Sequence, residues 1–170
     1  MSASTAEQKA QELLVEMKAQ VPIDVSATAE FVGLSIVEED LEDSVSGMLV
    51  VKDGHGVIGV NEHHHPNRRR FSVAHEIGHY LLHRKGASVF VDSTPVFFRD
   101  ETSAAGTKQQ EIEANAFAAE LLIPAASLRE RVEQQALDPY DDAAVHRLAR
   151  TFGVSAQALT IKLVRLDLIS

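Results

Sequence analysis

The chain has 170 residues, 45% of them apolar and 24% charged, which suffices for a compact domain with a buried core. It contains no cysteine, which excludes disulfides, thiolate zinc fingers, iron–sulfur clusters and cysteine nucleophiles. The formal net charge is −9, and most of the excess lies in residues 1–60, so the chain is a poor non-specific partner for nucleic acid.

The N-terminal residues predict helices rather than a targeting segment. Residues 5–20 carry apolar side chains near helical spacing, and residues 25–33 predict a second short helix closed by Gly33. No basic head precedes an apolar run here, and no stretch of the chain approaches the roughly 18 apolar residues of a membrane span. The expected location is the cytoplasm.

A β-hairpin is predicted next, after an acidic loop at residues 38–43. The β-prone runs 48–51 and 57–60 flank the turn sequence Asp-Gly-His-Gly at 53–56. Glycines 54, 56 and 59 match the spacing of a dinucleotide-binding loop. That loop must open a helix, whereas here the chain continues as a strand, so no nucleotide site is expected.

Helices dominate the rest of the predicted structure. Their Gly and Pro boundaries separate the segments. In chain order we expect a helix over 68–83, extended chain over 87–99, a polar loop over 100–109, a helix over 110–123, and helices over 126–168 with turns near Pro139 and Gly153.

Residues 75–79 read His-Glu-Ile-Gly-His within a helical pattern. Positions i and i+4 of a helix share a face, so His75 and His79 can direct two imidazoles at one cation. Zinc suits nitrogen ligands and accepts an open fourth position. Glu76 is rotated about 100° from His75, beside the metal, where it can take a proton from a water that the metal activates.

A catalytic zinc needs a third protein ligand, and helix 110–123 offers two. Glu111 lies about 60° from the apolar stripe of this helix and Glu113 about 100° away on the other side, so Glu111 is the expected ligand and Glu113 the fallback. Asn115 is positioned to hydrogen-bond a ligand histidine.

The remaining histidines near the motif are expected to have other roles. His63, His64 and His65 precede a proline and are interpreted as a polar loop rather than a second metal site. His83 lies near the helix end, where a cation interacts favourably with the helix dipole, and we prefer this interpretation to a ligand role.

These residues together resemble the ImmA/IrrE family of metallopeptidases. The resemblance covers about residues 20–170 and includes the histidine motif with its flanks. It is carried by the segments 46–50, 58–61, 69–83, 111–124, 148–155 and 168–169.

The resemblance implies an α+β fold. A zincin-like metallopeptidase domain with a small antiparallel sheet and an active-site helix would span residues 1–125. A helical, helix-turn-helix-like segment over 126–170 would pack on it. The family pattern also matches Glu111 as the third ligand. It implies cleavage of a helix-turn-helix repressor of the XRE type, which relieves repression of stress or mobile-element genes.

The C-terminal helices support a rival interpretation. A helix, a turn at Gly153 and a second helix capped by Ser155 match the layout of a DNA-binding helix-turn-helix. Residues 141–170 carry a net charge of only +1, which is small for a phosphate-binding surface, so we interpret them as packing or substrate-docking elements. A metal-binding module without turnover is a third class, and Glu76 favours hydrolysis over it.

The sequence therefore predicts a metal-dependent endopeptidase of the cytoplasm. His75, His79 and Glu111 hold Zn²⁺, with Mn²⁺ as the alternative, and Glu76 is the general base. The partner is a protein substrate, and neither a membrane nor direct DNA binding is expected. No residue is assigned to stabilise the oxyanion; the candidates are Tyr80, Arg99, Tyr140 and His146.

Overall fold

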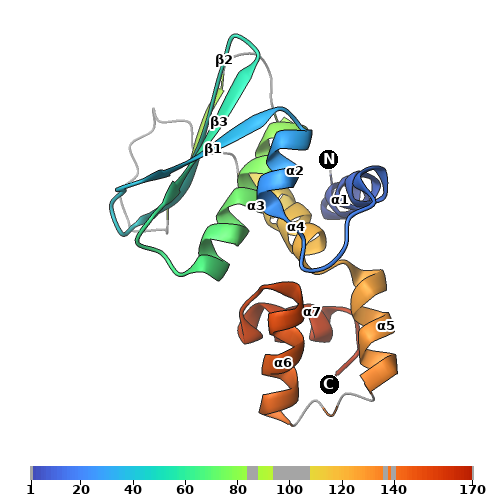
Figure 1. Ribbon diagram of the computed structural model, residues 1–170. Coiled ribbons are helices and arrows are strands. Elements are labelled where there is room, and N and C mark those ends of the chain that lie inside the picture. The colour runs from blue at the N-terminus through green and yellow to red at the C-terminus, as the bar shows by residue number, and fades with distance from the viewer. Residues whose placement is uncertain (1, 84–87, 94–107, 136–137, 139–140, 170) are drawn as a thin grey trace.

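A computed structural model describes residues 2–83, 88–93, 108–135, 138 and 141–169 of the chain (Figure 1). Helices and strands are interleaved as far as residue 93, and the described residues after that point form helices. The elements are α1 (Ala3–Met17), α2 (Val25–Phe31), β1 (Leu34–Glu39), β2 (Val45–Lys52), β3 (His55–Asn61), α3 (Pro66–His83), β4 (Ser88–Ser93), α4 (Lys108–Leu122), α5 (Ala125–Gln135), α6 (Asp142–Phe152) and α7 (Ala156–Arg165).

The strands form one sheet in the order β1-β3-β2-β4. The predicted hairpin is confirmed: β2 and β3 pair antiparallel, and the chain reverses at Asp53 and Gly54, whose φ angles are 52° and 78°. Positive φ at both central residues is the geometry that favours Asp-Gly in a two-residue turn. The strand at β3 also confirms that the glycine spacing there opens no nucleotide-binding helix.

The α+β class is confirmed, but the sheet is not wholly antiparallel as predicted. β1 pairs parallel to β3, while β4 pairs antiparallel to β2. β1 was not predicted because its six residues, Leu-Ser-Ile-Val-Glu-Glu, form neither a continuous apolar run nor a strict alternation of apolar and polar residues. Its last residues, Glu38 and Glu39, belong to the acidic stretch that was predicted to be loop.

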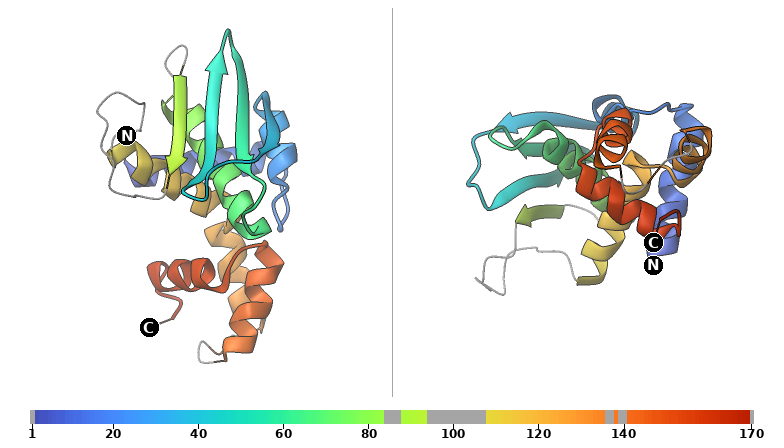
Figure 2. Two further views of the ribbon diagram at one scale, coloured as in Figure 1. Left: turned by 90° about the vertical axis from the view of Figure 1, so that its left-hand side faces the viewer. Right: turned by 90° about the horizontal axis from the view of Figure 1, so that it is seen from below.

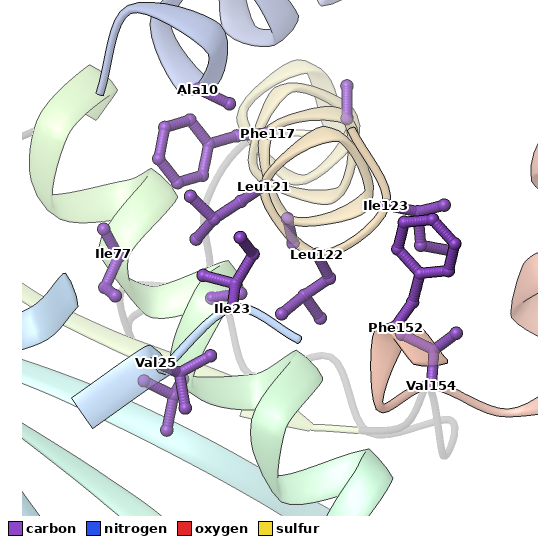
Figure 3. Close-up of a cluster of buried hydrophobic side chains, with 14 of the residues drawn as sticks. Ala10, Ile23, Val25, Ile77, Phe117, Leu121, Leu122, Ile123, Phe152 and Val154 are labelled. Carbon is purple, nitrogen blue, oxygen red and sulfur yellow. The ribbon is translucent and has the colours of Figure 1, made fainter. Parts of the chain in front are cut away.

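The helices are layered behind the sheet. Helix α3 packs on β2 and β3, α4 packs on α3, and α1 packs on α4. The apolar core lies where these helices meet. Phe117 and Leu121 of α4 point toward Ile77 of α3 and Ile23 (Figure 3), and all four side chains are buried. The core therefore fixes α3 against α4.

Helices α5, α6 and α7 lie together at the end of the molecule away from the tip of the β2–β3 hairpin (Figures 1 and 2). The Arg70 guanidinium of α3 donates to the carbonyl oxygens of Ile23 at 2.8 Å and Gly153 at 3.0 Å. Phe152 and Val154 belong to the same core as the α4 residues. The domain boundary at residue 125 stays a prediction.

A buried ion pair also joins the C-terminal helices to α4. Lys162 Nζ of α7 lies 2.5 Å from Glu120 Oε2, and both residues are almost fully buried. The other carboxylate oxygen of Glu120 accepts from Gln11 Nε2 at 3.0 Å and from the Ala125 backbone N–H at 3.1 Å. One carboxylate therefore connects α1, α4, α5 and α7.

The expected helix-turn-helix layout is present in α6 and α7. The Ser155 hydroxyl accepts from the Ala158 backbone N–H at 3.1 Å, which confirms it as the N-cap, and Gly153 has the positive φ of 65° that ends α6. Strand β4 confirms part of the extended segment at 87–99. The remainder of that segment, most of the polar loop at 100–109 and the turn at Pro139 lie outside the described residues.

None of the helices within the described ranges is long and apolar enough to cross a membrane.

Removing the positive partner of the buried pair should destabilise the fold strongly. We expect Lys162→Met to lower the free energy of unfolding by about 3–5 kcal/mol, because it leaves the Glu120 charge buried without its cation. Urea unfolding followed by circular dichroism measures this. Arg147→Met is the matched control, since the side chain of Arg147 is 60% exposed and its pair with Asp141 contributes about 1 kcal/mol or less. An equally small change for Lys162→Met would contradict the inferred role.

Candidate metal centre

The site is built where α3 crosses α4, and the crossing is close because of Gly78. A Cβ added at Gly78 would stand 3.1 Å from Phe117 Cδ1 and 3.3 Å from both the Cα and the carbonyl oxygen of Ala114. The missing side chain therefore lets the two helix backbones approach. His75 and His79 flank Gly78 on α3, so the same contact brings their rings to α4.

The two imidazoles and one carboxylate of α4 converge. His75 Nε2 and His79 Nε2 lie 3.0 Å apart, and they stand 3.2 and 3.1 Å from the two carboxylate oxygens of Glu111. The histidines are buried, while the Glu111 side chain is 38% exposed. The cluster thus opens to solvent on the side of Glu111.

The donor atoms fit a divalent cation. Ligand atoms held about 2.0–2.1 Å from a tetrahedral zinc ion stand about 3.3 Å from one another, close to the separations in the cluster. Burial lowers the pKa of His79, which favours the neutral imidazole. Burial would raise the pKa of Glu111, but the two imidazoles at 3.2 and 3.1 Å from its oxygens outweigh this effect and hold the pKa below its ordinary value. Neutral imidazoles and an ionised carboxylate are the forms that bind metal.

Each histidine of the cluster is also held through its other ring nitrogen. His75 Nδ1 lies 3.0 Å from Asn115 Oδ1, which confirms the contact expected from the sequence. His79 Nδ1 lies 3.0 Å from His83 Nδ1, and His83 Nε2 lies 2.8 Å from Glu113 Oε2. From the sequence we expected His83 to act as a cation at the helix end. Its buried contact with Glu113 was not expected.

The two carboxylates of α4 differ from the burial that helical phase predicted. Glu113, not Glu111, is the more buried: its side chain is 3% exposed, against 38% for Glu111. Hydrogen bonds with Gln109 and His83 lower the pKa of Glu113 to about 2. Helical phase was uninformative because α3 and α1 both pack on α4 and bury it on more than one side.

Glu76 lies on the sheet side of the cluster. It follows His75 in α3 and is fully buried, and a Cβ on Gly47 of β2 would stand 3.6 Å from its Oε1. The Glu76 carboxylate therefore lies between α3 and β2, in contact with the strand at position 47. Glu76 is thus adjacent to the cluster without being one of its members.

An apolar groove of about 490 Å³ begins beside the cluster and runs between α4 and α7. Asn115, the partner of His75, lines it together with Phe71, Ile112 and Ile161. Ile112 is 45% exposed and Ile161 61% exposed, so apolar surface there faces solvent. The groove is lined by this partner of His75 but by no member of the cluster itself, and a larger cavity of about 560 Å³ between the end of α1 and the start of α5 is lined by neither.

The oxyanion candidates gain no support from their positions. Tyr80 lies against Gly56 of β3, where a Cβ on the glycine would stand 3.4 Å from the ring. His146 is exposed on α6, and its Nδ1 lies 2.8 Å from the Asp142 carbonyl oxygen. Arg99 and Tyr140 lie outside the described residues.

The histidines before α3 lie in a polar loop, as interpreted from the sequence. His63 Nε2 lies 2.9 Å from Asp40 Oδ1, and this hydrogen bond raises the pKa of His63. His64 Nε2 lies 3.2 Å from the Asp43 carbonyl oxygen. The buried Asn61, which was given no role from the sequence, holds this loop against the β1–β2 connection. Its side-chain oxygen accepts from the His63 backbone N–H at 3.0 Å, and its side-chain nitrogen donates to the carbonyls of Leu41, Glu42 and Val45.

A model of one protein family matches residues 29–164, which is most of the chain and includes the whole cluster. The family is Peptidase_M78, described as the IrrE N-terminal-like domain. The chain belongs to this family. The resemblance seen in the sequence is thereby confirmed, and the chain is a member of a metallopeptidase family in which a metal ion is expected.

Two individual proteins are also similar to this member of the Peptidase_M78 family. "Uncharacterized immunity region protein 2" of Bacillus phage phi105 is 26% identical over 114 residues, which cover 67% of this chain and 65% of the phage protein. A solved "Mycobacterium tuberculosis transcriptional regulator" superposes with a TM-score of 0.60 at 20% identity over 94% of this chain and 46% of that one. The second match establishes a shared fold. This chain spans less than two thirds of either protein.

A side chain at position 78 should push α3 away from α4 and destabilise the fold. We expect Gly78→Ala to lower the free energy of unfolding by about 1–3 kcal/mol, because the added methyl group meets the Ala114 backbone. Alanine is the better helix former by about 1 kcal/mol, so a loss identifies the contact as its cause. Urea unfolding in chelator measures this, with the exposed Glu133→Ala on α5 as control. Unchanged or increased stability would show that the crossing tolerates a side chain.

Proposed function

We propose that this chain is a zinc-dependent endopeptidase that cleaves a helix-turn-helix repressor of the XRE type in a stress or mobile-element response. The observation that carries the proposal is the convergence of His75, His79 and Glu111 with Glu76 beside them. The proposal places the enzyme in the cytoplasm, where such a repressor acts.

The proposed ligands are His75, His79 and Glu111. Two imidazole nitrogens and a carboxylate oxygen are a donor set of catalytic zinc sites, and zinc is proposed ahead of Mn²⁺ because manganese prefers oxygen-rich octahedral sites. A divalent ion held there would acidify a water molecule and polarise the scissile carbonyl. The exposed side of Glu111 gives a substrate access to that position.

Glu76 is the proposed general acid–base. Its carboxylate would accept a proton from the attacking water and deliver it to the amine that leaves when the peptide bond breaks. The buried position beside Gly47 fixes the carboxylate next to the cluster and removes it from bulk solvent. A metal-binding module without turnover would not require a carboxylate at this point.

The groove between α4 and α7 is the proposed binding surface for the substrate chain. Asn115 places one part of the groove next to His75, and exposed Ile112 follows Glu111 in α4. An apolar segment of the substrate would bury Ile112 and Ile161 there while a neighbouring peptide bond lies at the cluster. The C-terminal helices would thus serve substrate docking.

The repressor class rests on the family resemblance, and the printed name of the phage protein fits it, because that protein is assigned to an immunity region. Direct DNA binding is less well supported. Of the four Lys and Arg residues in 141–170, Lys162 is buried on Glu120 and Arg165 pairs with Glu7. The helix-turn-helix of this chain therefore offers little free positive charge.

Replacing the general base should separate metal binding from cleavage. We expect Glu76→Gln to retain zinc but to lower kcat/KM at least about 100-fold, since the amide cannot accept the proton. Zinc-loaded protein is incubated with repressors encoded by neighbouring genes, and fragments are identified by mass. Glu133→Gln, exposed on α5, is the control. Undiminished cleavage by Glu76→Gln would remove the assignment.

The two carboxylates of α4 should differ in their effect on metal retention. We expect Glu111→Gln to weaken zinc binding more than Glu113→Gln does, because only Glu111 places its oxygens at the imidazole pair. Competition with a chromophoric zinc chelator measures both affinities. The reverse order would move the third ligand to Glu113.

A further inference from the structure

His83 and Glu113 form a buried chain behind His79 that the proposed reaction does not itself use. His83 is the last residue of α3, one turn beyond His79, and its side chain is 5% exposed. Its Nδ1 lies 3.0 Å from His79 Nδ1, and its Nε2 lies 2.8 Å from Glu113 Oε2. Gln109 Nε2 donates to the other oxygen of Glu113 at 2.9 Å.

The donors and acceptors in this chain have one consistent assignment for neutral imidazoles. An ionised carboxylate only accepts, so His83 Nε2 must carry the hydrogen that Glu113 receives. The Nδ1 atom of a neutral His83 is then an acceptor, so His79 Nδ1 must donate to it. The lone pair of His79 is therefore left on Nε2, the atom that faces His75 and Glu111.

His75 has the same tautomer as His79, and a single contact with Asn115 fixes it. The Asn115 side-chain oxygen accepts from His75 Nδ1, which leaves the His75 lone pair on Nε2. Both imidazoles are thus oriented from α4, one through an amide and the other through a second histidine and a carboxylate.

We propose that His83 and Glu113 are positioning residues that hold His79 in the tautomer and orientation needed to bind the metal. We call these three residues the His79–His83–Glu113 relay. The proposal rests on the metal site of the proposed function. It adds that zinc affinity depends on two side chains that do not contact the ion, and that Glu113 acts through His83.

The test compares position 83 variants by their zinc affinity, measured by competition with a chromophoric chelator. His83→Leu removes both hydrogen bonds, and we expect zinc affinity to fall about 10–100-fold, the usual effect of losing such a partner. His83→Gln carries an acceptor for His79 and a donor for Glu113, so its affinity should stay within about threefold of the wild type. A purely structural role would not be rescued by glutamine in this way.

Further variants test the order of the relay. His83→Asn is too short to reach both partners and should resemble His83→Leu; it replaces that variant if the leucine protein does not fold in chelator. Adding Glu113→Gln to His83→Leu should cause no further loss, because Glu113 acts through His83. His146→Leu, an exposed histidine change on α6, is the control.

Every outcome bears on the relay. Wild-type affinity in His83→Leu, or an equal loss in His83→Gln, overturns it, as does a further loss in the double variant. If Glu111→Gln weakens zinc binding while His83→Leu does not, only the relay fails. If the wild-type protein binds no zinc, the metal site and the relay fail together.

Discussion

The site depends on the distance between two helices, and that distance is set at Gly78. With no side chain there, α3 meets the Ala114 backbone and the Phe117 ring of α4 directly. His75 and His79 belong to α3 and Glu111 to α4, so the three donor groups share a cation only if the helices cross this closely. Core residues such as Ile77 and Leu121 then hold the crossing in place.

Both α3 and α4 contribute the side chains that determine the chemistry of the site. The histidine motif supplies the nitrogen atoms, whereas α4 supplies the carboxylate that meets them and the groups that fix their hydrogens. Since Glu111, Glu113 and Asn115 lie within two turns of one helix, a rotation of α4 would disturb all three contacts together. The geometry of the site therefore depends on the position of α4 as much as on the histidine motif of α3.

The sequence predicts the local features of this molecule well. The β-hairpin follows from its Asp-Gly turn, the histidine face of α3 from i,i+4 spacing, and the Asn115 contact from its place one turn beyond Glu111. Features that depend on tertiary packing were not predictable. The parallel pairing of β1, the burial of Glu113 and the partners of His83 and Lys162 all require knowing which helix packs where. A polar residue with a buried partner looks like a surface residue in sequence.

Arg70 and Glu120 have a consequence for how the chain could be divided. Cutting after residue 125 would remove the Gly153 carbonyl from one and the Lys162 ammonium from the other. Arg70 would keep the Ile23 carbonyl and Glu120 would keep Gln11, but the carboxylate would lose its cation and both groups would border a newly uncovered apolar surface, which is costly. The parts of the chain before and after residue 125 are therefore expected to unfold as one cooperative unit, and a chain cut there would lose solubility although it keeps the histidine motif.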